Sequence, residues 1–274
     1  MFEQKITPPS SDSETPSFAD DRTPSSRVEE LTSALAELTP AERLVRIRRV
    51  IDGRIVFTHG FGVEGQLLYH WICEHDLDID VVTLDTGRLF PETYKLWSET
   101  ERRYGRRIQA IYPAHAALES LVKRYGVDGF YESKQARVAC CTARKTKPLE
   151  RALAGASAWI AGLRADQSDA RHEASVVAFD DGRGVLKVNP LVDWTRERVL
   201  AAVKANKIPI NSLHAKGFGS IGCAPCTRAI APGEPERSGR WWREKDGARE
   251  CGLHQPLKKS ERRTSAQAGN AARG

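Results

Sequence analysis

The sequence has 274 residues, of which 40% are hydrophobic, and this is enough to bury one sizeable core. The formal net charge of +6 favours an anionic ligand, but the basic residues are spread along the chain, so no nucleic acid is expected. No apolar run approaches the ~20 residues that cross a bilayer, and six cysteines are too few for a secreted disulfide scaffold. We therefore expect a cytoplasmic protein with reduced thiols and no membrane partner; a homo-oligomer is compatible with the sequence.

The two ends of the chain differ in composition from its middle. Residues 1–26 are rich in Pro, Ser, Thr and Asp without an apolar period, so they are expected to form a disordered tail. Residues 258–274 are polar and are expected to form a second disordered tail. Between them, residues 27–257 are predicted to form a single domain.

Helices come first and are followed by alternating strands and helices. Capping boxes that begin at Ser26 and Thr39 predict two helices, which end near Leu38 and Asp52. After Gly53 the pattern changes to short β-rich runs separated by helices. The predicted pairs are strand 54–58 with helix 65–75, strand 80–84 with helix 91–104, and strand 107–112 with helix 116–125.

The alternation continues beyond the third pair. An apolar run at 158–163 predicts a fourth strand. Residues 175–179 and 185–188 flank a turn at 180–183 and predict a hairpin, and a further helix is capped at Thr195. Such alternation predicts an α/β fold with a doubly wound parallel sheet, whose ligands bind beyond the carboxyl ends of the strands.

Three loops that follow predicted strands combine glycine with polar or cationic side chains. Glycine there lets backbone N–H groups approach an anion at a helix N-terminus, although such loops also use glycine merely to turn. The first loop is neither a Walker loop nor a Rossmann fingerprint, and an Asx turn with a solvated arginine is the alternative for the second. Because the loops share one sheet edge, we expect a phosphate pocket. The candidate residues are His59, Gly60, Phe61 and Gly62, then Leu84, Asp85, Thr86, Gly87 and Arg88, then Arg164.

Four cysteines form the most informative pattern. Cys140 and Cys141 are adjacent, and Cys223 and Cys226 enclose an Ala-Pro pair. Adjacent side chains diverge by about 100° in a helix, whereas a zinc ion needs sulfurs that converge at ~2.3 Å. An iron–sulfur cube offers a separate iron at each corner, so neighbouring residues can bind different corners. We therefore predict one [4Fe-4S] site; buried apolar thiols and a redox dithiol are the alternatives.

The last part of the chain holds two arginines and a further cysteine. Arg237 and Arg240 precede a Trp-Trp pair, and Cys251 is followed by His254. A thiol beside cations and a histidine is a candidate nucleophile, although a spare thiol is the ordinary alternative. Cys73 falls on a predicted amphipathic helix and is expected to be a core thiol.

These motifs together resemble the thioredoxin-dependent assimilatory adenylylsulfate (APS) reductases of the PAPS/APS reductase family. The resemblance covers about residues 55–254, and its motifs are Leu84-Asp85-Thr86-Gly87, Cys140-Cys141 with Arg144-Lys145, Gly162-Leu163-Arg164, Lys187-Val188-Asn189-Pro190-Leu191, Cys223-Ala224-Pro225-Cys226 and Glu250-Cys251-Gly252-Leu253-His254. The resemblance implies an adenine-nucleotide α-hydrolase-like fold with a C-terminal active-site segment and a [4Fe-4S] cluster. It also implies reduction of APS to sulfite and AMP by thioredoxin or a glutaredoxin-like dithiol donor, in sulfate assimilation and cysteine biosynthesis.

The resemblance also implies roles for individual residues. Cys251 becomes the nucleophile, which forms a thiosulfonate, and the four paired cysteines become the cluster ligands. Lys145 follows Cys141 by one helical turn and is expected to connect cluster and sulfate. The loop at 59–62 is looser than the Ser-Gly-Gly of related pyrophosphatases, and Gly65 stands where the family frequently has Asp. The residues expected to offset the anionic groups of APS are Lys145, Arg164, Arg237, Arg240 and His254.

Two other functions are compatible with these residues. One is reduction of the 3′-phosphorylated substrate PAPS, which asks for an additional cation site. The other is a zinc-holding regulatory protein that binds a nucleotide without turnover. Competition between the two substrates tests the first alternative, and metal analysis tests the second.

Overall fold

The computed structural model describes residues 23–244 and 251–254. Most of the first predicted tail and all of the second lie outside these described residues. Helix α1 (Pro24–Leu35) begins inside the predicted first tail. Thr23 caps it and accepts the backbone N–H of Ser26, so the predicted start at Ser26 was wrong.

The second predicted capping box is confirmed. Helix α2 (Pro40–Val50) has Thr39 as its N-cap, and Glu42 accepts the backbone N–H of Thr39 in return at 2.8 Å. Two orphan donors of the helix start are thereby satisfied by its own first turn.

Within residues 23–244, six strands form one mixed sheet in the order β3-β2-β1-β4-β6-β5. Every neighbouring pair is parallel except β5 and β6, which form the predicted antiparallel hairpin. The strands are β1 (Arg54–Thr58), β2 (Asp80–Leu84), β3 (Gln109–Ile111), β4 (Ala156–Ile160), β5 (Val177–Asp180) and β6 (Val185–Val188). The predicted α/β class with a doubly wound, mostly parallel sheet is confirmed.

The remaining α-helices of the described residues lie between these strands, except α8, which follows β6. They are α3 (Val63–Glu74), α4 (Pro91–Tyr104), α5 (His115–Tyr125), α6 (Lys134–Cys141), α7 (Lys147–Ala152) and α8 (Arg196–Ala205). Gly105 and Gly126 close α4 and α5 with φ values of 64° and 73°, which a side chain would disfavour. In the part of the chain that the structure describes, no helix combines the length and apolarity needed to cross a membrane.

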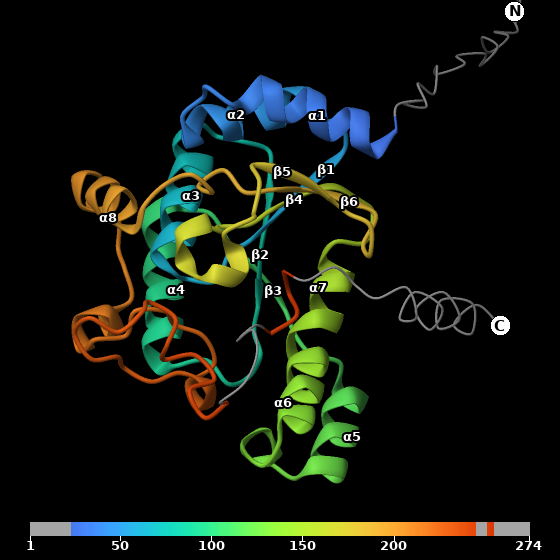
Figure 1. Cartoon of the computed structure of the whole chain (residues 1–274), viewed down its shortest axis with the longest axis vertical. Helices are drawn as coiled ribbons and strands as arrows, with labels where there is room; N and C mark the ends of the chain where they lie inside the picture. Colours follow the sequence, from blue (N-terminus) through green and yellow to red (C-terminus); the bar gives the residue numbers. More distant parts are fainter. Residues whose placement is uncertain (1–22, 245–250, 255–274) are drawn as a thin grey trace, which may run out of the picture.

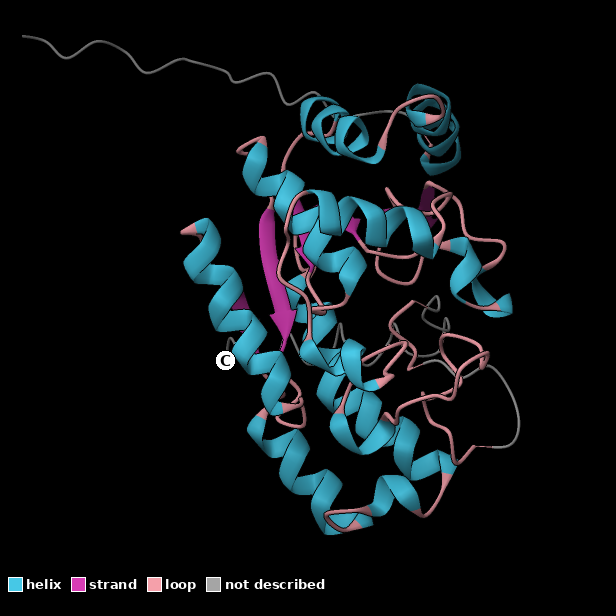
Figure 2. Cartoon of the chain, turned by 90° about the vertical axis from the view of Figure 1, so that its left-hand side faces the viewer, coloured by secondary structure: helices cyan, strands magenta, loops and turns pink. Residues whose placement is uncertain are grey.

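Apolar side chains cover both faces of the sheet. On β1, Ile55 and Phe57 join one buried cluster and Val56 joins the other, as alternation along a strand requires. Helices α1, α2, α3, α4 and α8 contribute to the first cluster and α7 to the second. Figure 1 shows α3, α4 and α8 on one side of the strands and α7 on the other, and Figure 2 shows helices on both sides of the strands. Trp159 of β4 lies in the second cluster, against which Leu253 also packs.

The strand order determines where a ligand can bind. From β1 the chain adds β2 and β3 on one side, and it later adds β4 on the other side of β1. The loops that leave β1 and β4 therefore diverge. This switch point opens a crevice beyond the carboxyl ends of the two strands.

Candidate functional site

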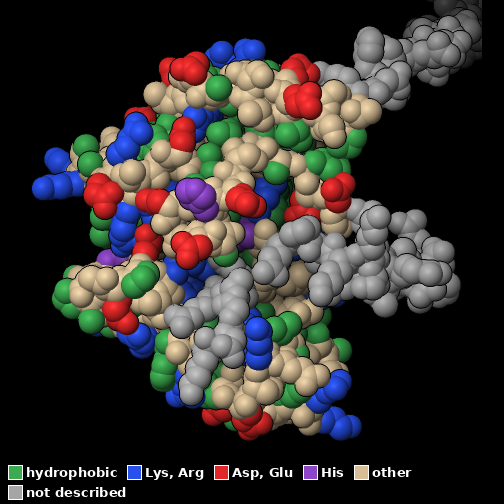
Figure 3. All heavy atoms as spheres, in the orientation of Figure 1, with side chains coloured by type: hydrophobic (Ala, Val, Ile, Leu, Met, Phe, Trp, Pro, Cys, Tyr) green, Lys and Arg blue, Asp and Glu red, His purple; other side chains and the backbone are tan. Residues whose placement is uncertain are grey.

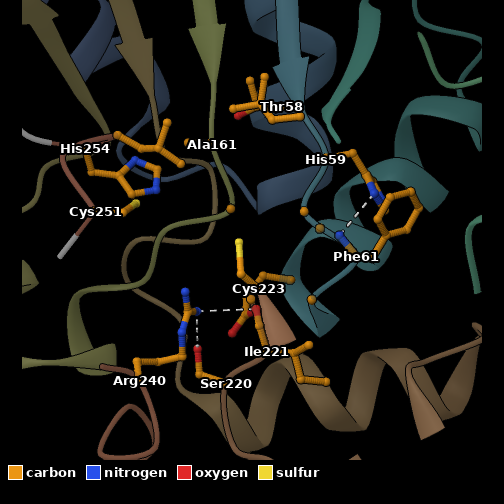
Figure 4. Close-up of a pocket in the computed structure, with 18 of the residues that line it drawn as sticks. Thr58, His59, Phe61, Ala161, Ser220, Ile221, Cys223, Arg240, Cys251 and His254 are labelled. Atoms are coloured by element: carbon orange, nitrogen blue, oxygen red, sulfur yellow. Dashed lines mark hydrogen bonds between the residues drawn. The ribbon is translucent and has the colours of Figure 1, made fainter. Parts of the chain in front are cut away.

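A cavity of about 240 Å³ occupies this crevice. Figure 4 shows Cys251 on one side of it, His59 on the opposite side and the thiol of Cys223 pointing in between them. The cavity thus collects residues that are far apart in the sequence. Its walls come from the loop between β1 and α3, the end of β4, and residues within 219–223, 236–241 and 251–254.

The start of α3 forms one wall and carries no side-chain cap. Its N-cap is Gly62, and residues 58–65 all line the cavity. An uncapped helix start leaves backbone N–H groups for an anion. In the same loop Phe61 has a φ of 56°, a conformation that bulky residues rarely adopt and that occurs at functional sites.

His59 of this loop is a buried, neutral imidazole. Burial lowers its pKa to about 3. Its Nδ1 accepts the backbone N–H of Phe61 at 3.3 Å, which assigns the ring proton to Nε2. His59 therefore shapes the loop from inside and brings no charge to the cavity.

Arg237 and Arg240 both line the cavity. The buried Arg240 donates from Nη1 to Ser220 Oγ and to the carbonyl oxygen of Ile221, both at 3.3 Å. Gly222 permits this approach, because a Cβ atom there would clash with the guanidinium group. Among the described residues Arg240 Nε has no hydrogen-bond partner, as expected of a donor that a ligand completes.

Lys145 lies between the cavity and the cysteines. It is reached from Cys141 through a π-helical turn, Thr142–Thr146, in place of the predicted α-helical turn. Burial acts to lower the pKa of Lys145, but Cys223, Cys251 and Cys141 together raise it above its ordinary value. Lys145 is therefore a charged ammonium in a turn type that is frequent at functional sites.

Cys251 lines the cavity and interacts electrostatically with Lys145. Close by in Figure 4, the half-buried His254 has a pKa held well below its ordinary value, first by desolvation and then by Lys187 and Arg171. These surroundings favour a neutral imidazole near pH 7, whereas the sequence suggested a cation at this position. Within the described chain its Nδ1 has no hydrogen-bond partner, so one bond remains for a ligand.

The loop after β2 reaches the cavity only in part. Asp85 holds the turn by accepting the backbone N–H of Gly87 at 2.9 Å. Thr86 places its hydroxyl 3.3 Å from Cys223 Sγ, and the carbonyl of Arg88 accepts a backbone N–H from the residue after Cys223. The loop thus ties β2 to the cysteine segment. Of its predicted substrate residues, the cavity is lined by Leu84 and Thr86 and not by Asp85, Gly87 or Arg88.

Arg164 is enclosed by carboxylates and does not line the cavity. It is fully buried and donates to Glu64 at 2.9 Å, to Asp166 at 2.8 Å and to Glu236 at 2.5 Å. Glu64 belongs to α3, and Glu236 precedes Arg237, so these ion pairs join two walls of the cavity. The contacts of Arg164 favour a structural role over the substrate contact expected from the sequence.

Replacing Arg164 by methionine should destabilise the protein by about 3–5 kcal/mol, because buried carboxylates would lose their counter-ion. The melting temperature should fall by roughly ten degrees, which calorimetry would measure. Lys216→Met removes an exposed pair with Glu92 and should change it little. An Arg164→Met protein with the wild-type melting temperature and a raised KM would instead support the substrate contact expected from the sequence.

The four paired cysteines converge on a second, smaller pocket beside the cavity. Two lie at the end of α6, and of the other two Cys223 is the N-cap and Cys226 the last residue of a single helical turn, Ala224–Cys226. Among the described residues no group of three His, Cys, Asp or Glu side chains is close enough to hold one metal ion. The pocket is lined by Cys140, Cys141, Cys223 and Cys226 and by the cations Arg88, Arg137, Arg144 and Lys145.

The surroundings of these thiols differ. Burial raises the pKa of Cys226 to about 12 and that of Cys141 to about 11. Burial acts on Cys223 in the same sense, but Lys145 and the Thr86 hydroxyl outweigh it and lower the pKa of Cys223. Cys223 and Lys145 line both pockets and so connect them.

The positive charge of the site lies inside the molecule. On the face drawn in Figure 3, basic and acidic side chains are interspersed and form no single basic patch. In contrast, Arg144 and Lys145 are each 8% exposed and Arg240 is 6% exposed. In such surroundings a charge acts more strongly on a bound anion than it would in water.

Several cavity residues were not singled out from the sequence. Arg171 is a buried cation whose Nη1 donates to Gln167 Oε1 at 2.5 Å. Its place in the loop after β4 was a usable signal, whereas Trp159 lies inside a strand and carried none. Other lining residues of this kind include Glu64, Gln167, His214 and Glu236.

Comparison with known proteins gives consistent matches. Residues 54–229 match the sequence profile described as the phosphoadenosine phosphosulfate reductase domain. A protein of Sinorhizobium fredii named adenosine 5′-phosphosulfate reductase is 53% identical over 224 residues, which cover 82% of this chain and 89% of that one. A protein of the same name from Allochromatium vinosum is 48% identical over 218 residues, which cover 80% and 85%. The phosphoadenylyl-sulfate (PAPS) reductase of Candida auris, solved with phosphate, has a TM-score of 0.62 at 27% identity and covers 73% of this chain and 95% of that one.

Proposed function

The chain belongs to the phosphoadenosine phosphosulfate reductase domain family, and from this premise we propose that it is an oxidoreductase that reduces adenylyl sulfate (APS) to sulfite and AMP. Relatives that share about half of its residues carry the name of this activity. The reaction belongs to sulfate assimilation, and its sulfite serves cysteine biosynthesis. The observation that carries the proposal is the meeting of Cys251, Lys145 and Arg240 at one cavity with the start of α3.

This arrangement suits the charge of APS. The substrate presents a phosphate and a sulfate on either side of the bond to be broken, so an approaching thiolate is repelled. Lys145 and Arg240 supply buried positive charge, and the uncapped start of α3 offers backbone N–H groups. His254 is neutral and can add one hydrogen bond but no charge.

The proposed reaction uses Cys251 as the nucleophile. Its thiolate attacks the sulfur of APS, the bond between that sulfur and the phosphate oxygen breaks, and AMP leaves with the bonding electron pair. The sulfonate is then carried on Cys251 as a thiosulfonate. A dithiol donor, thioredoxin or a glutaredoxin-like protein, attacks the sulfur of Cys251 and releases sulfite. The second thiol of the donor resolves the mixed disulfide, so the donor supplies both electrons and Cys251 is restored.

We further propose that Cys140, Cys141, Cys223 and Cys226 hold a [4Fe-4S] cluster. The residues fit this group, because four thiols and four cations line one pocket. A bound cluster would hold α6 to the Cys-Ala-Pro-Cys segment and contribute to the electrostatics next to Lys145. The surrounding cations Arg88, Arg137 and Arg144 offset the charge of the four thiolates. The reaction needs reduced thiols, so we place the enzyme in the cytoplasm.

The proposal is tested by measuring sulfite release from APS with thioredoxin, under anaerobic conditions, in competition with PAPS. We expect APS to be consumed in preference to PAPS. Absence of sulfite in the presence of intact iron and reduced thioredoxin would refute the activity. Preference for PAPS would correct the substrate and leave the chemistry in place.

Replacing Lys145 by methionine should lower kcat/KM for APS by a factor of about 10² to 10³, because a buried cation beside the developing charge is lost. The iron content should stay at the wild-type level, since Lys145 is not a ligand. Lys147→Met is the matched control, because Lys147 lies two residues further on, 45% exposed and paired with Glu150 at 2.9 Å. Equal kinetics for the Lys145 variant and the control would remove Lys145 from the substrate site.

A further inference from the structure

The Lys-Val-Asn-Pro-Leu motif that begins at Lys187 supplies no group to the proposed reaction. Lys187 on β6 is the register partner of Trp159 on β4, so both side chains project from the same face of the sheet. The indole N–H of Trp159 donates to Thr58 Oγ1 at 2.8 Å. Contacts with β1 and β4 therefore fix the ring, and Lys187 of β6 lies beside it.

His254, the last described residue, contacts both Trp159 and Lys187. The imidazole of His254 is stacked on the indole of Trp159, with ring centroids 5.5 Å apart and an interplanar angle of 5°. Lys187 Nζ lies 4.9 Å from the centroid of the same indole and donates to the carbonyl oxygen of His254 at 3.4 Å. An offset stack and a cation over a ring each add specific attraction beyond burial.

Apolar packing fixes the neighbouring residue. Leu253 packs against the buried cluster that contains Leu149 and Trp159. Between Leu253 and Cys251 the chain turns at Gly252, which has a φ of 85°. Leu253 and His254 are thus anchored to the sheet, and Cys251 is presented to the cavity on the other side of that turn.

The neutral state of His254 is compatible with its position on Trp159. Its imidazole lies among cations, Lys187 and Arg183 over the same indole and Arg171 nearby, and a second positive ring there would be repelled. Uncharged, the ring can stack on Trp159 next to Lys187 without that cost. Desolvation first, and then the cations Lys187 and Arg183 on this indole, therefore favour the neutral ring of His254.

We propose that Trp159 and Lys187 are positioning residues. Their contacts with Leu253 and His254, called the seat below, hold Cys251 in the cavity. The catalytic consequence rests on the proposed function of Cys251 as nucleophile. The seat itself does not, because it is a set of contacts within the chain. A misplacement of about 1 Å at a reacting group can cost on the order of 10² in rate, so Trp159 and Lys187 act through the position of Cys251.

The first test measures the seat without substrate. Hydrogen exchange of a peptide that contains residues 251–254 should be several-fold faster in Lys187→Met and in Trp159→Leu than in wild type. Arg198→Met is the matched control, since Arg198 lies 4.7 Å from the indole of Trp194 on another part of the surface. If Trp159→Leu fails to fold, Lys187→Met decides alone. Exchange equal to wild type in Lys187→Met would overturn the proposal.

The second test measures transfer of sulfur label from APS to Cys251 in a single turnover of the cluster-loaded enzyme. Lys187→Met should slow transfer about tenfold, and Lys187→Arg, which keeps a cation over the indole, should recover most of the rate. Adding His254→Ala to Lys187→Met should slow it no further than the slower single variant, because both act on one contact. Additive losses would overturn the proposal. If wild type takes up no label, the nucleophile assignment fails, and the exchange result still decides the seat.

Discussion

Replacing Cys251 by serine should abolish the uptake of sulfur label from APS and lower turnover by a factor on the order of 10³ or more. A serine hydroxyl is barely ionised at neutral pH, whereas a thiol readily supplies the thiolate that attacks sulfur. Wild-type enzyme given APS without thioredoxin should bind about one label per chain and release AMP in equal amount. Added dithiol should then release the label as sulfite. Mass spectrometry of the labelled peptide would locate the thiosulfonate.

The iron content separates this result from a loss of structure. Cys251→Ser should keep the iron of wild type, because Cys251 is not one of the four proposed ligands. Cys73→Ser is the matched control: Cys73 lies on α3, is partly buried and packs against the apolar core. It should keep both iron and label uptake. Label retained by Cys251→Ser, or found on another cysteine of wild type, would contradict the mechanism.

Replacing any one of the four pocket cysteines by serine should remove the cluster and the activity together. Each corner of the cube needs a thiolate, so iron should fall from about four per chain towards none. Activity should fall with it, because the walls that carry Lys145 and Cys223 are joined through this pocket. Iron and acid-labile sulfide, measured after anaerobic purification, test the prediction.

The same measurements distinguish the ligands from the other cysteines and iron from zinc. Cys73→Ser should keep the wild-type iron content. Iron retained in Cys141→Ser together with iron lost in Cys73→Ser would show that the ligand assignment is wrong. Zinc without sulfide in wild type would support a structural metal site in place of a cluster.

Local sequence patterns determined the α/β fold class and the bounds of several elements. β1, β2, β6 and α4 have their predicted ends, because apolar period, proline and glycine act within a few residues of the position they define. The start of α1 was misplaced for a related reason. Either Thr23 or Ser26 can serve as an N-cap, and the sequence pattern does not decide between them.

The sequence also identified the candidate site residues, because only a few residue types can bind a metal, act as a nucleophile or offset an anion. Cysteines in two pairs and cations beside them are informative wherever they lie in the chain. The structure places all four paired cysteines on one pocket and places Cys251, Lys145 and Arg240 on the adjoining cavity. Their roles as ligands, nucleophile and substrate contacts stay predictions.

Only the tertiary structure decided what charge and which neighbours each site residue has. Arg164 resembles a substrate cation in sequence, but its carboxylates on Glu64 and Glu236 lie 100 and 72 residues away. His254 resembles a cation too, yet burial against Trp159 and the nearness of Lys187 keep it neutral. Protonation depends on desolvation and on charges within a few ångströms, and those are set by contacts between distant segments, which no local pattern encodes.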